Sequence, residues 1–120
     1  MTDRGSLFPS LDLIAAERQR QVEREGWTPD HDDGHTLNEL AAAGACYALL
    51  ETRWKDSGVL GKRLVRDILW PWQWEEFKPA DYPDPPFGPD VHIDKKVKNL
   101  VRAAALIAAE IDRLERQRRA

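Results

Sequence analysis

The spacing of apolar residues predicts a helix near the start of the chain. Apolar side chains recur three, four and seven residues apart over 10–25, the period that places them on one face of a helix. Ser10 can cap the start of this helix and Gly26 can end it. The residues expected to face the core are Leu11, Ile14, Ala15 and Val22.

A second helix is predicted over about 36–54. The letters "TLNE" at its start fit a capping box, with Thr36 as the N-cap and Glu39 at N3. Gly44 lies on the apolar face of this helix, so another helix could approach it closely. The other residues of that face are Leu37, Leu40, Ala41, Tyr47 and Ala48.

The last part of the chain predicts a long helix over about 94–117, with Asp94 as its N-cap. Three apolar residues in its middle, Ala105, Leu106 and Ala109, lie away from the main stripe, so the helix is expected to be packed on two sides. It is therefore either the central helix of a bundle or part of a subunit contact, and we expect a homo-oligomer, most simply a symmetric dimer. The main stripe consists of Val97, Leu100, Val101, Ala104, Ile107, Ala108, Ile111 and Leu114.

Between the helices lies the proline-rich stretch "WPWQWEEFKPADYPDPPFGPD", which holds six of the eight prolines. Proline lacks a backbone donor and fixes φ, so a regular helix or strand is not expected there. The stretch is too aromatic for a solvated linker, because large rings bury much surface when they dock. It is interpreted as an ordered, irregular lid. The preceding stretch "GVLGKRLVRDIL" is a weaker helix candidate. The aromatic residues of the lid are Trp70, Trp72, Trp74, Phe77, Tyr82 and Phe87.

These elements indicate an all-α fold: a small bundle of three to four helices with an irregular Trp/Pro-rich lid, in a single domain over 1–120. The single cysteine, Cys46, excludes an internal disulfide and a thiolate zinc cluster, which favours an intracellular setting. No apolar run approaches the roughly 20 residues that cross a bilayer, and the first residues do not resemble a signal peptide. We expect a soluble, cytoplasmic protein with no membrane partner and no duplex DNA partner.

The net charge of −3 conceals an asymmetry between the two ends of the chain. Residues 25–51 contain six carboxylates and no Lys or Arg, whereas residues 92–120 contain eight Lys or Arg against four Asp or Glu. Such opposite fields can pair within the fold or between subunits. The cationic helix can also attract a phosphate-bearing ligand through Lys95, Lys98 and Arg102, although such residues ordinarily form a solvated helix face.

The stretch "EREGWTPDHDDGHTLNEL" offers a candidate metal site. It is not an EF-hand, because the sixth residue from Asp30 is His35 instead of Gly and the twelfth is Ala41 instead of Glu. It is not a His-Asp phosphohydrolase either, since no histidine precedes His31. The loose spacing favours a tight turn and helix cap, with no bound metal or cofactor. A transition-metal site remains stereochemically possible, with the ligands His31, Asp33, His35 and Glu39.

The order of several blocks resembles a family of short phage and prophage accessory proteins without an established activity. These blocks are "AAERQRQVEREGWTPDHDDGHTLNELAAAGACYAL", then "WPW" with "FKPAD", then "KNLVRAAALIAAEIDRL". The resemblance covers most of the chain, and 52–69 and 81–93 look like insertions of this member. It implies a biological context and no particular chemistry.

A more distant resemblance is to the MazG-like all-α nucleotide pyrophosphohydrolases, which share an early "ER-x-RQ" helix and a closing alanine-rich helix. Those enzymes hold magnesium on a triphosphate with Glu-x-x-Glu and Glu-x-x-Asp motifs on two helices. The second helix here offers only Glu39 and Glu51, which are too far apart for such a pair. Where the last helix would carry acids, this chain has Lys98, Asn99 and Arg102. The departure argues against MazG-type hydrolysis and leaves a phosphate-binding pocket open.

Three functions follow as hypotheses. The first is a non-catalytic accessory protein that binds, and could sequester, a nucleotide or another phosphate-bearing ligand. The second is a metal-dependent nucleotide hydrolase that uses the histidine and carboxylate cluster. The third is a small homo-oligomeric interaction module without a ligand. In the first, the phosphate would be bound by Lys98 and Arg102, with Lys95 nearby, and the base would stack on Trp70 or Trp72.

Overall fold

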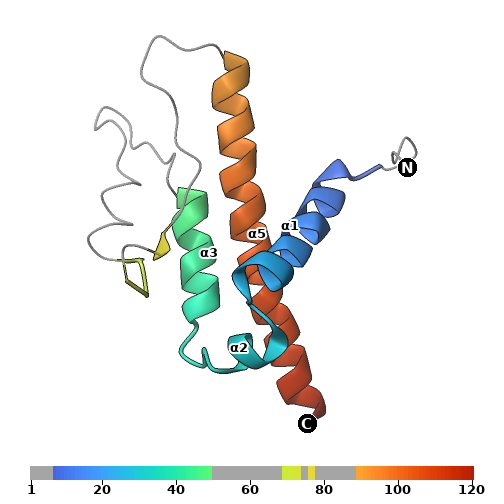
Figure 1. Ribbon diagram of the computed structural model, residues 1–120, viewed down its shortest axis with the longest axis vertical. Helices are drawn as coiled ribbons and strands as arrows, with labels where there is room; N and C mark the ends of the chain where they lie inside the picture. Colours follow the sequence, from blue (N-terminus) through green and yellow to red (C-terminus); the bar gives the residue numbers. More distant parts are fainter. Residues whose placement is uncertain (1–6, 50–68, 74–75, 78–88) are drawn as a thin grey trace.

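The computed structural model describes residues 7–49, 69–73, 76–77 and 89–120. The predicted all-α fold is confirmed, because the described residues form helices and no strand. None of the helices in these ranges is long and apolar enough to cross a membrane. The helices are α1 (Pro9–Glu25), α2 (Pro29–Asp33), α3 (Glu39–Leu49) and α5 (Pro89–Arg119) (Figure 1).

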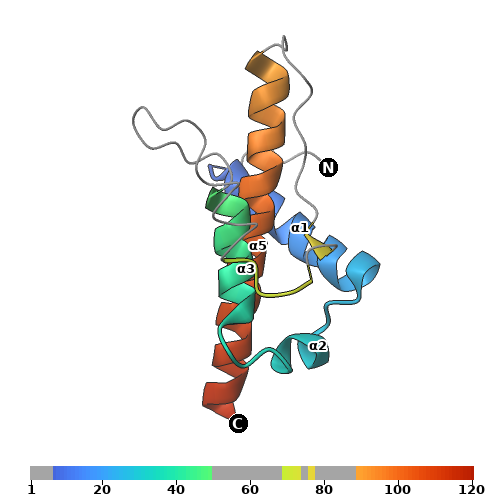
Figure 2. The same cartoon turned by 90° about the vertical axis from the view of Figure 1, so that its left-hand side faces the viewer.

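The long helix α5 is the element that every other described helix contacts. Helix α3 runs alongside the middle of α5, whereas α1 crosses α5 at a steep angle (Figures 1 and 2). Helix α2 contacts α5 nearer its C-terminus. The prediction that the last helix is central is therefore confirmed, although it starts at Pro89 and contains Asp94, the predicted N-cap, within its first turns. Proline suits such a start, because the first turn needs no backbone donor there.

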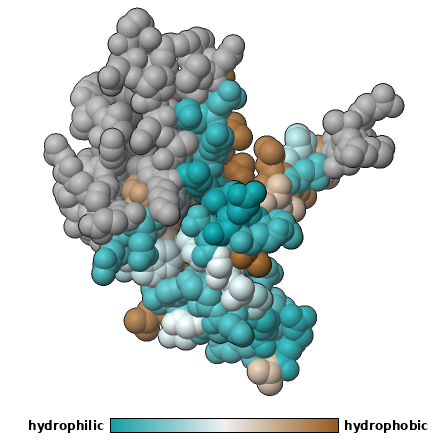
Figure 3. Space-filling model, in the orientation of Figure 1, coloured by the Kyte–Doolittle hydropathy of each residue, from teal (hydrophilic) through white to brown (hydrophobic). Residues whose placement is uncertain are grey.

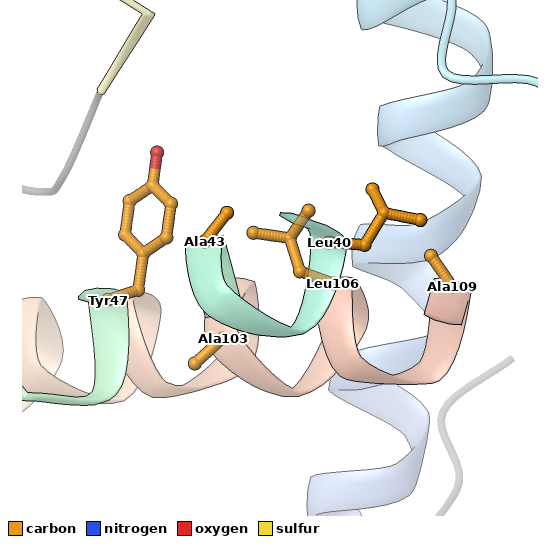
Figure 4. Close-up of a cluster of buried hydrophobic side chains, with 6 residues drawn as sticks. All are labelled: Leu40, Ala43, Tyr47, Ala103, Leu106 and Ala109. Carbon is orange, nitrogen blue, oxygen red and sulfur yellow. The ribbon is translucent and has the colours of Figure 1, made fainter. Parts of the chain in front are cut away.

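The apolar core lies where α3 meets α5 (Figure 4). An added Cβ on Gly44 would lie only 2.8 Å from the carbonyl oxygen of Ala103 and 3.0 Å from a side-chain carbon of Ile107. The predicted close approach at Gly44 is thus confirmed, and it requires small residues on both helices. The core residues are Leu40, Ala43, Tyr47, Ala103, Leu106 and Ala109.

The two apolar faces of α5 have different surroundings. Ala105, Leu106 and Ala109, the residues away from the main stripe, are fully or almost fully buried and lie in the bundle. Most large side chains of the main stripe are instead exposed to solvent, with Ile111 at 56% and Leu100 at 45%. Burial within this chain therefore follows the alanine-rich face, because the two helices are so close at Gly44 that mostly small side chains, with Leu106 as the exception, fit between them.

Helix α1 turns a largely polar face to the bundle, so the predicted apolar core face was wrong for Leu11 and Ala15, which are exposed. Its fully buried residue is Gln21. Ser10 lies inside the helix, which begins at Pro9 without a side-chain cap. The predicted end is correct: Gly26 adopts the left-handed conformation with φ of 74°, which glycine reaches without steric cost.

The short helix α2 replaces the tight turn predicted for "TPDHDD". The side chain of Thr28 caps α2 by accepting a hydrogen bond from the backbone N–H of His31 at 3.3 Å. Thr36 is not the N-cap of the next helix, which begins three residues later, at Glu39. Asn38, in the left-handed region with φ of 66°, starts that helix by accepting from the N–H of Ala42.

The carboxylate of Glu39 accepts a hydrogen bond of 2.7 Å from the backbone N–H of Leu37. This bond, and not the predicted capping box with Thr36, is the backbone contact that Glu39 makes ahead of the helix. Leu37, predicted on the apolar face, is 83% exposed in the loop before this helix. The described part of the helix ends at Leu49. The predicted extension over 50–54, the candidate helix at 58–69 apart from its last residue, and Trp74, Tyr82 and Phe87 of the lid lie outside the described residues.

We expect Gly44→Ala to lower the free energy of unfolding by about 1–3 kcal/mol, because the new methyl group would be pressed against the backbone of α5. Gly34→Ala is the matched control: its Cβ would meet only ordinary contacts, the nearest at 3.4 Å, so we expect little change. Chemical denaturation of the three proteins measures both values. Equal stability of Gly44→Ala and the unmodified protein would contradict the close α3–α5 contact.

We also expect Thr28→Ala to lower the free energy of unfolding by about 1 kcal/mol through loss of the α2 cap. Thr36→Ala should change it little, because Thr36 is exposed and precedes the start of α3. Thermal unfolding of both variants tests the assignment. A larger loss of stability for Thr36→Ala than for Thr28→Ala would contradict this assignment and support the predicted capping box at Thr36.

Candidate ligand-binding cleft

A cleft of about 440 Å³ opens beside the α3–α5 core, at the polar face of α1. Its volume lies within the roughly 300–1,000 Å³ typical of small-molecule sites. Side chains from four separate parts of the chain meet there, which is the arrangement expected of a binding site built on a rigid scaffold. The residues that line the cleft are Glu17, Arg20, Gln21, Glu25, Trp27, His31, Tyr47, Glu76, Arg102 and Leu106.

One wall of the cleft is a hydrogen-bonded network on α1. Arg20 donates two hydrogen bonds of 2.8 Å to the carboxylate of Glu17 and a longer one of 3.4 Å to Glu25. Gln21 donates to the same Glu17 carboxylate at 3.1 Å. The guanidinium of Arg20 is thus held in place by two acids one turn before and after it.

The charges of this network change the pKa of its members. Burial acts to raise the pKa of Glu17, but hydrogen bonds from Arg20 and Gln21, with the charges of Arg20 and Arg102, outweigh burial and hold it below its usual value. The hydrogen bonds and charge of Glu17 raise the pKa of Arg20. Both groups are therefore ionised at neutral pH.

Gln21 is a buried polar residue whose side-chain carbonyl lacks a hydrogen-bond donor among the described residues. Its side chain is 1% exposed, and its carbonyl Oε1 accepts no hydrogen bond from the described residues. An unsatisfied buried carbonyl costs about 1–3 kcal/mol. An N–H or O–H group of a ligand, or an ordered water, at this wall of the cleft would recover that cost.

Aromatic side chains also line the cleft, which adjoins a hollow of about 310 Å³. The two share Trp27, His31 and Glu76, and the hollow adds His35, Trp72 and Gln73. The rings of Trp27 and His31 are nearly parallel, 6° apart, with centroids separated by 6.1 Å. His35 lies 4.9 Å from both His31 and Trp72, measured between ring centroids. The cleft therefore offers flat surfaces suited to a planar ligand ring.

Part of the predicted lid packs as expected against the helices. Trp70 contacts Phe77 and Tyr47 with ring centroids 4.6 and 5.9 Å apart, and its indole N–H donates to the carbonyl of Gln73 at 2.9 Å. Trp70 and Trp72 both pack against the core, and Trp72 also lines the hollow. Beneath Trp70, burial raises the pKa of the Cys46 thiol to about 11, so the thiol stays protonated.

The five predicted ligand residues are not brought together. Arg102 lines the cleft and Trp72 the adjoining hollow. Lys98 is exposed on α5 and Lys95 is half-buried, and neither lines the cleft or the hollow. The three carboxylates and two guanidiniums of the lining give a formal charge of −1 with His31 neutral, so the site is less basic than the sequence suggested.

The four residues of the alternative metal site are held by separate partners. His35 pairs with Glu39 at 3.0 Å, and the pKa of Glu39 is lowered, mainly by that hydrogen bond. His31 pairs with the neighbouring Asp32 at 3.1 Å. Asp33 instead accepts a hydrogen bond of 2.7 Å from Arg116 of α5. Within the described ranges, no three His, Cys, Asp or Glu side chains are grouped so as to hold a metal ion.

Sequence reasoning missed most of the cleft wall on α1. Glu17, Arg20 and Gln21 stand three and four residues apart and so share one helical face, but polar residues at that spacing usually indicate a solvated face. One signal in the sequence could have revealed it: the second half of this helix, 17–25, has Val22 as its one apolar residue, so its contact with the rest of the fold had to be polar. No family model, curated protein or solved structure matches this chain. The site is therefore interpreted from its geometry alone.

The lowered pKa of Glu17 predicts a pH dependence of stability. Because the folded-state pKa lies below the usual value near 4.5, the ionised carboxylate stabilises the fold above that pH, and this contribution is lost as pH falls through the folded-state pKa. We expect Glu17→Gln to unfold at a lower temperature than the unmodified protein at pH 7, with the difference shrinking towards pH 3. Thermal unfolding across this range measures it. A difference that stays constant with pH would contradict the ionic role of Glu17.

Proposed function

We propose that the cleft binds a small phosphate-bearing ligand with a planar ring, of the nucleotide class, without hydrolysing it. The observation that carries the proposal is that Arg102 of α5 and the rings of Trp27, His31 and Tyr47 line one cleft of about 440 Å³. A guanidinium can donate two charge-assisted hydrogen bonds to phosphate, and aromatic faces can stack a base. These are the two recognition elements that a nucleotide requires.

The polar wall on α1 offers hydrogen-bond acceptors to a ligand. The carbonyl of Gln21 and the carboxylates of Glu17 and Glu25 are acceptors, so this wall suits a ring that carries N–H donors. The negative formal charge of the lining would repel a bare polyphosphate. A magnesium complex would reduce that repulsion, because Mg²⁺ usually binds to phosphate oxygens together with one or two carboxylates.

Sequestration of such a ligand would agree with the resemblance to phage and prophage accessory proteins. The cleft supports a MazG-like hydrolase less well. Three carboxylates line it, which is the kind of group that holds magnesium on a phosphate, but the described residues contain no acidic cluster able to hold a metal ion. Hydrolysis is therefore the alternative that the binding experiment must also detect.

The test is calorimetric titration with mono-, di-, tri- and cyclic nucleotides, with and without magnesium, followed by chromatography of the products. We expect saturable binding of at least one nucleotide, tighter with magnesium for the di- and triphosphates, and no turnover. Trp72→Ala should weaken binding roughly 5- to 100-fold if the ring stacks on the base. Absence of heat with every nucleotide would contradict the proposal, and product formation would favour the hydrolase.

Charge reversal on α5 provides a matched pair of variants. Arg102→Glu should abolish binding, and the milder Arg102→Gln should weaken it, because Arg102 lines the cleft. Lys98→Glu makes the same charge change one turn away on the exposed surface and should leave affinity nearly unchanged. Glutamate is a good helix former, so circular dichroism should show intact helices in all three. Equal loss of affinity in Lys98→Glu and Arg102→Glu would contradict a specific role for Arg102.

A further inference from the structure

The exposed apolar residues of α5 follow a heptad repeat. From Ile93 to Leu114 they are separated alternately by four and three residues, the 3.5-residue period of the contact line in a coiled coil. The line has seven consecutive positions, none of them charged, and covers three heptads, enough to indicate a coiled coil. We call it the α5 seam. Its positions are Ile93, Val97, Leu100, Ala104, Ile107, Ile111 and Leu114.

Most of the seam is open to solvent in the described part of the chain. Its six large side chains are between 40% and 56% exposed, and Ile107, at the edge of the seam, also lies beside Gly44 of α3. Figure 3 shows apolar surface, in brown, where the upper part of α5 faces α1. At the 1.5 Å rise per residue of a helix the seam is roughly 30 Å long. A continuous apolar line of this length on a soluble domain indicates an interaction surface.

We propose that two copies of this protein associate through their α5 seams to form a symmetric dimer. Knobs-into-holes packing requires a facing helix with the same 3.5-residue period, and a second copy of α5 supplies it. The repeat also has the apolar residue types of a coiled coil. One set of positions holds Val97, Ala104 and Ile111, and the other alternates isoleucine and leucine: Ile93, Leu100, Ile107 and Leu114. The small Ala104 at the middle lets two such helices come close.

The charges beside the seam favour a second copy over a strongly charged partner. Asp94 and Glu115 lie on one flank, and Lys96 lies on the other. A rim with both signs does not repel itself and offers no strong field to a purely acidic or basic partner. The surface is also distinct from Ala105, Leu106 and Ala109, which lie in the core of a single chain and are unavailable for a contact between chains.

Sedimentation equilibrium of the full chain at micromolar concentration tests the proposal. We expect the measured mass to be that of a dimer. The double variant Leu100→Glu/Ile111→Glu should raise the dimer Kd by roughly 1,000-fold or more, because four apolar side chains per dimer would be replaced by carboxylates. Leu37→Glu is the control: Leu37 is 83% exposed but lies in the loop before α3, outside the seam. It should leave the dimer intact.

Three results would overturn the proposal: a monomeric unmodified protein, a dimer that survives the double variant with its helices intact, or a dimer lost in Leu37→Glu. Circular dichroism of the double variant shows whether it remains helical, as expected for substitutions at exposed positions. If the double variant loses its helices, the oligomeric states of the unmodified protein and of Leu37→Glu still decide whether the protein is a dimer or a monomer. The dimer requires no ligand, so its failure would leave the proposed nucleotide site untouched.

Discussion

The close contact between α3 and α5 at Gly44 is the constraint on which the rest of the structure depends. The carbonyl oxygen of Ala103 occupies the space that a Cβ on residue 44 would need. Helices this close can bury only small side chains between them, which explains why alanines dominate the core and why Leu106 is its one large aliphatic residue on α5. The larger aliphatic side chains of α5 are consequently directed to its other face, where they form the α5 seam.

The remaining helices are attached to α5 by polar contacts more than by apolar packing. Arg18 of α1 lies 3.8 Å from both Asp32 of α2 and Asp112 of α5, and Arg116 of α5 pairs with Asp33 of α2 at 2.7 Å. Asp32 is completely buried, so its charge must be balanced locally. Because α1 meets the bundle through charged and amide groups, a polar cleft remains beside Tyr47 and Arg102. The architecture and the candidate site thus have the same physical origin.

Periodicity predicted the three longer helices, but neither the short α2 nor the residues at which the helices begin. Ser10, Thr36 and Asp94 all have the chemistry of an N-cap, yet proline starts two of these helices upstream and Asn38 starts the third downstream. The end at Gly26 and the contact at Gly44 were predictable because only glycine suits those backbone positions. The choice between the two apolar faces of α5 was not, because both are apolar and the decision depends on the volume available beside α3.

The candidate site was predictable only in part for a similar reason. Arg102 could be singled out because a cation interrupts an apolar helix, and Trp72 because tryptophan is rarely left in solvent. Lys98 and Lys95 lie on nearly the same face of α5 but one and two turns before Arg102, so they fall beyond the cleft. Glu17, Arg20 and Gln21 could not be distinguished from solvated residues until the crossing of α1 over α5 was known.

We propose that the polar face of α1 and the aromatic side chains of the cleft form a nucleotide site. The most direct measurement is nuclear magnetic resonance of the tryptophan indole N–H groups during titration with a nucleotide and magnesium. If a nucleotide binds in the cleft, the signals of Trp27 and Trp72 should shift, while that of Trp70, which packs against Phe77 and donates a hydrogen bond to Gln73, should stay in place. A shift of Trp70 alone, or no shift of Trp27 and Trp72 with any nucleotide, would contradict this proposal.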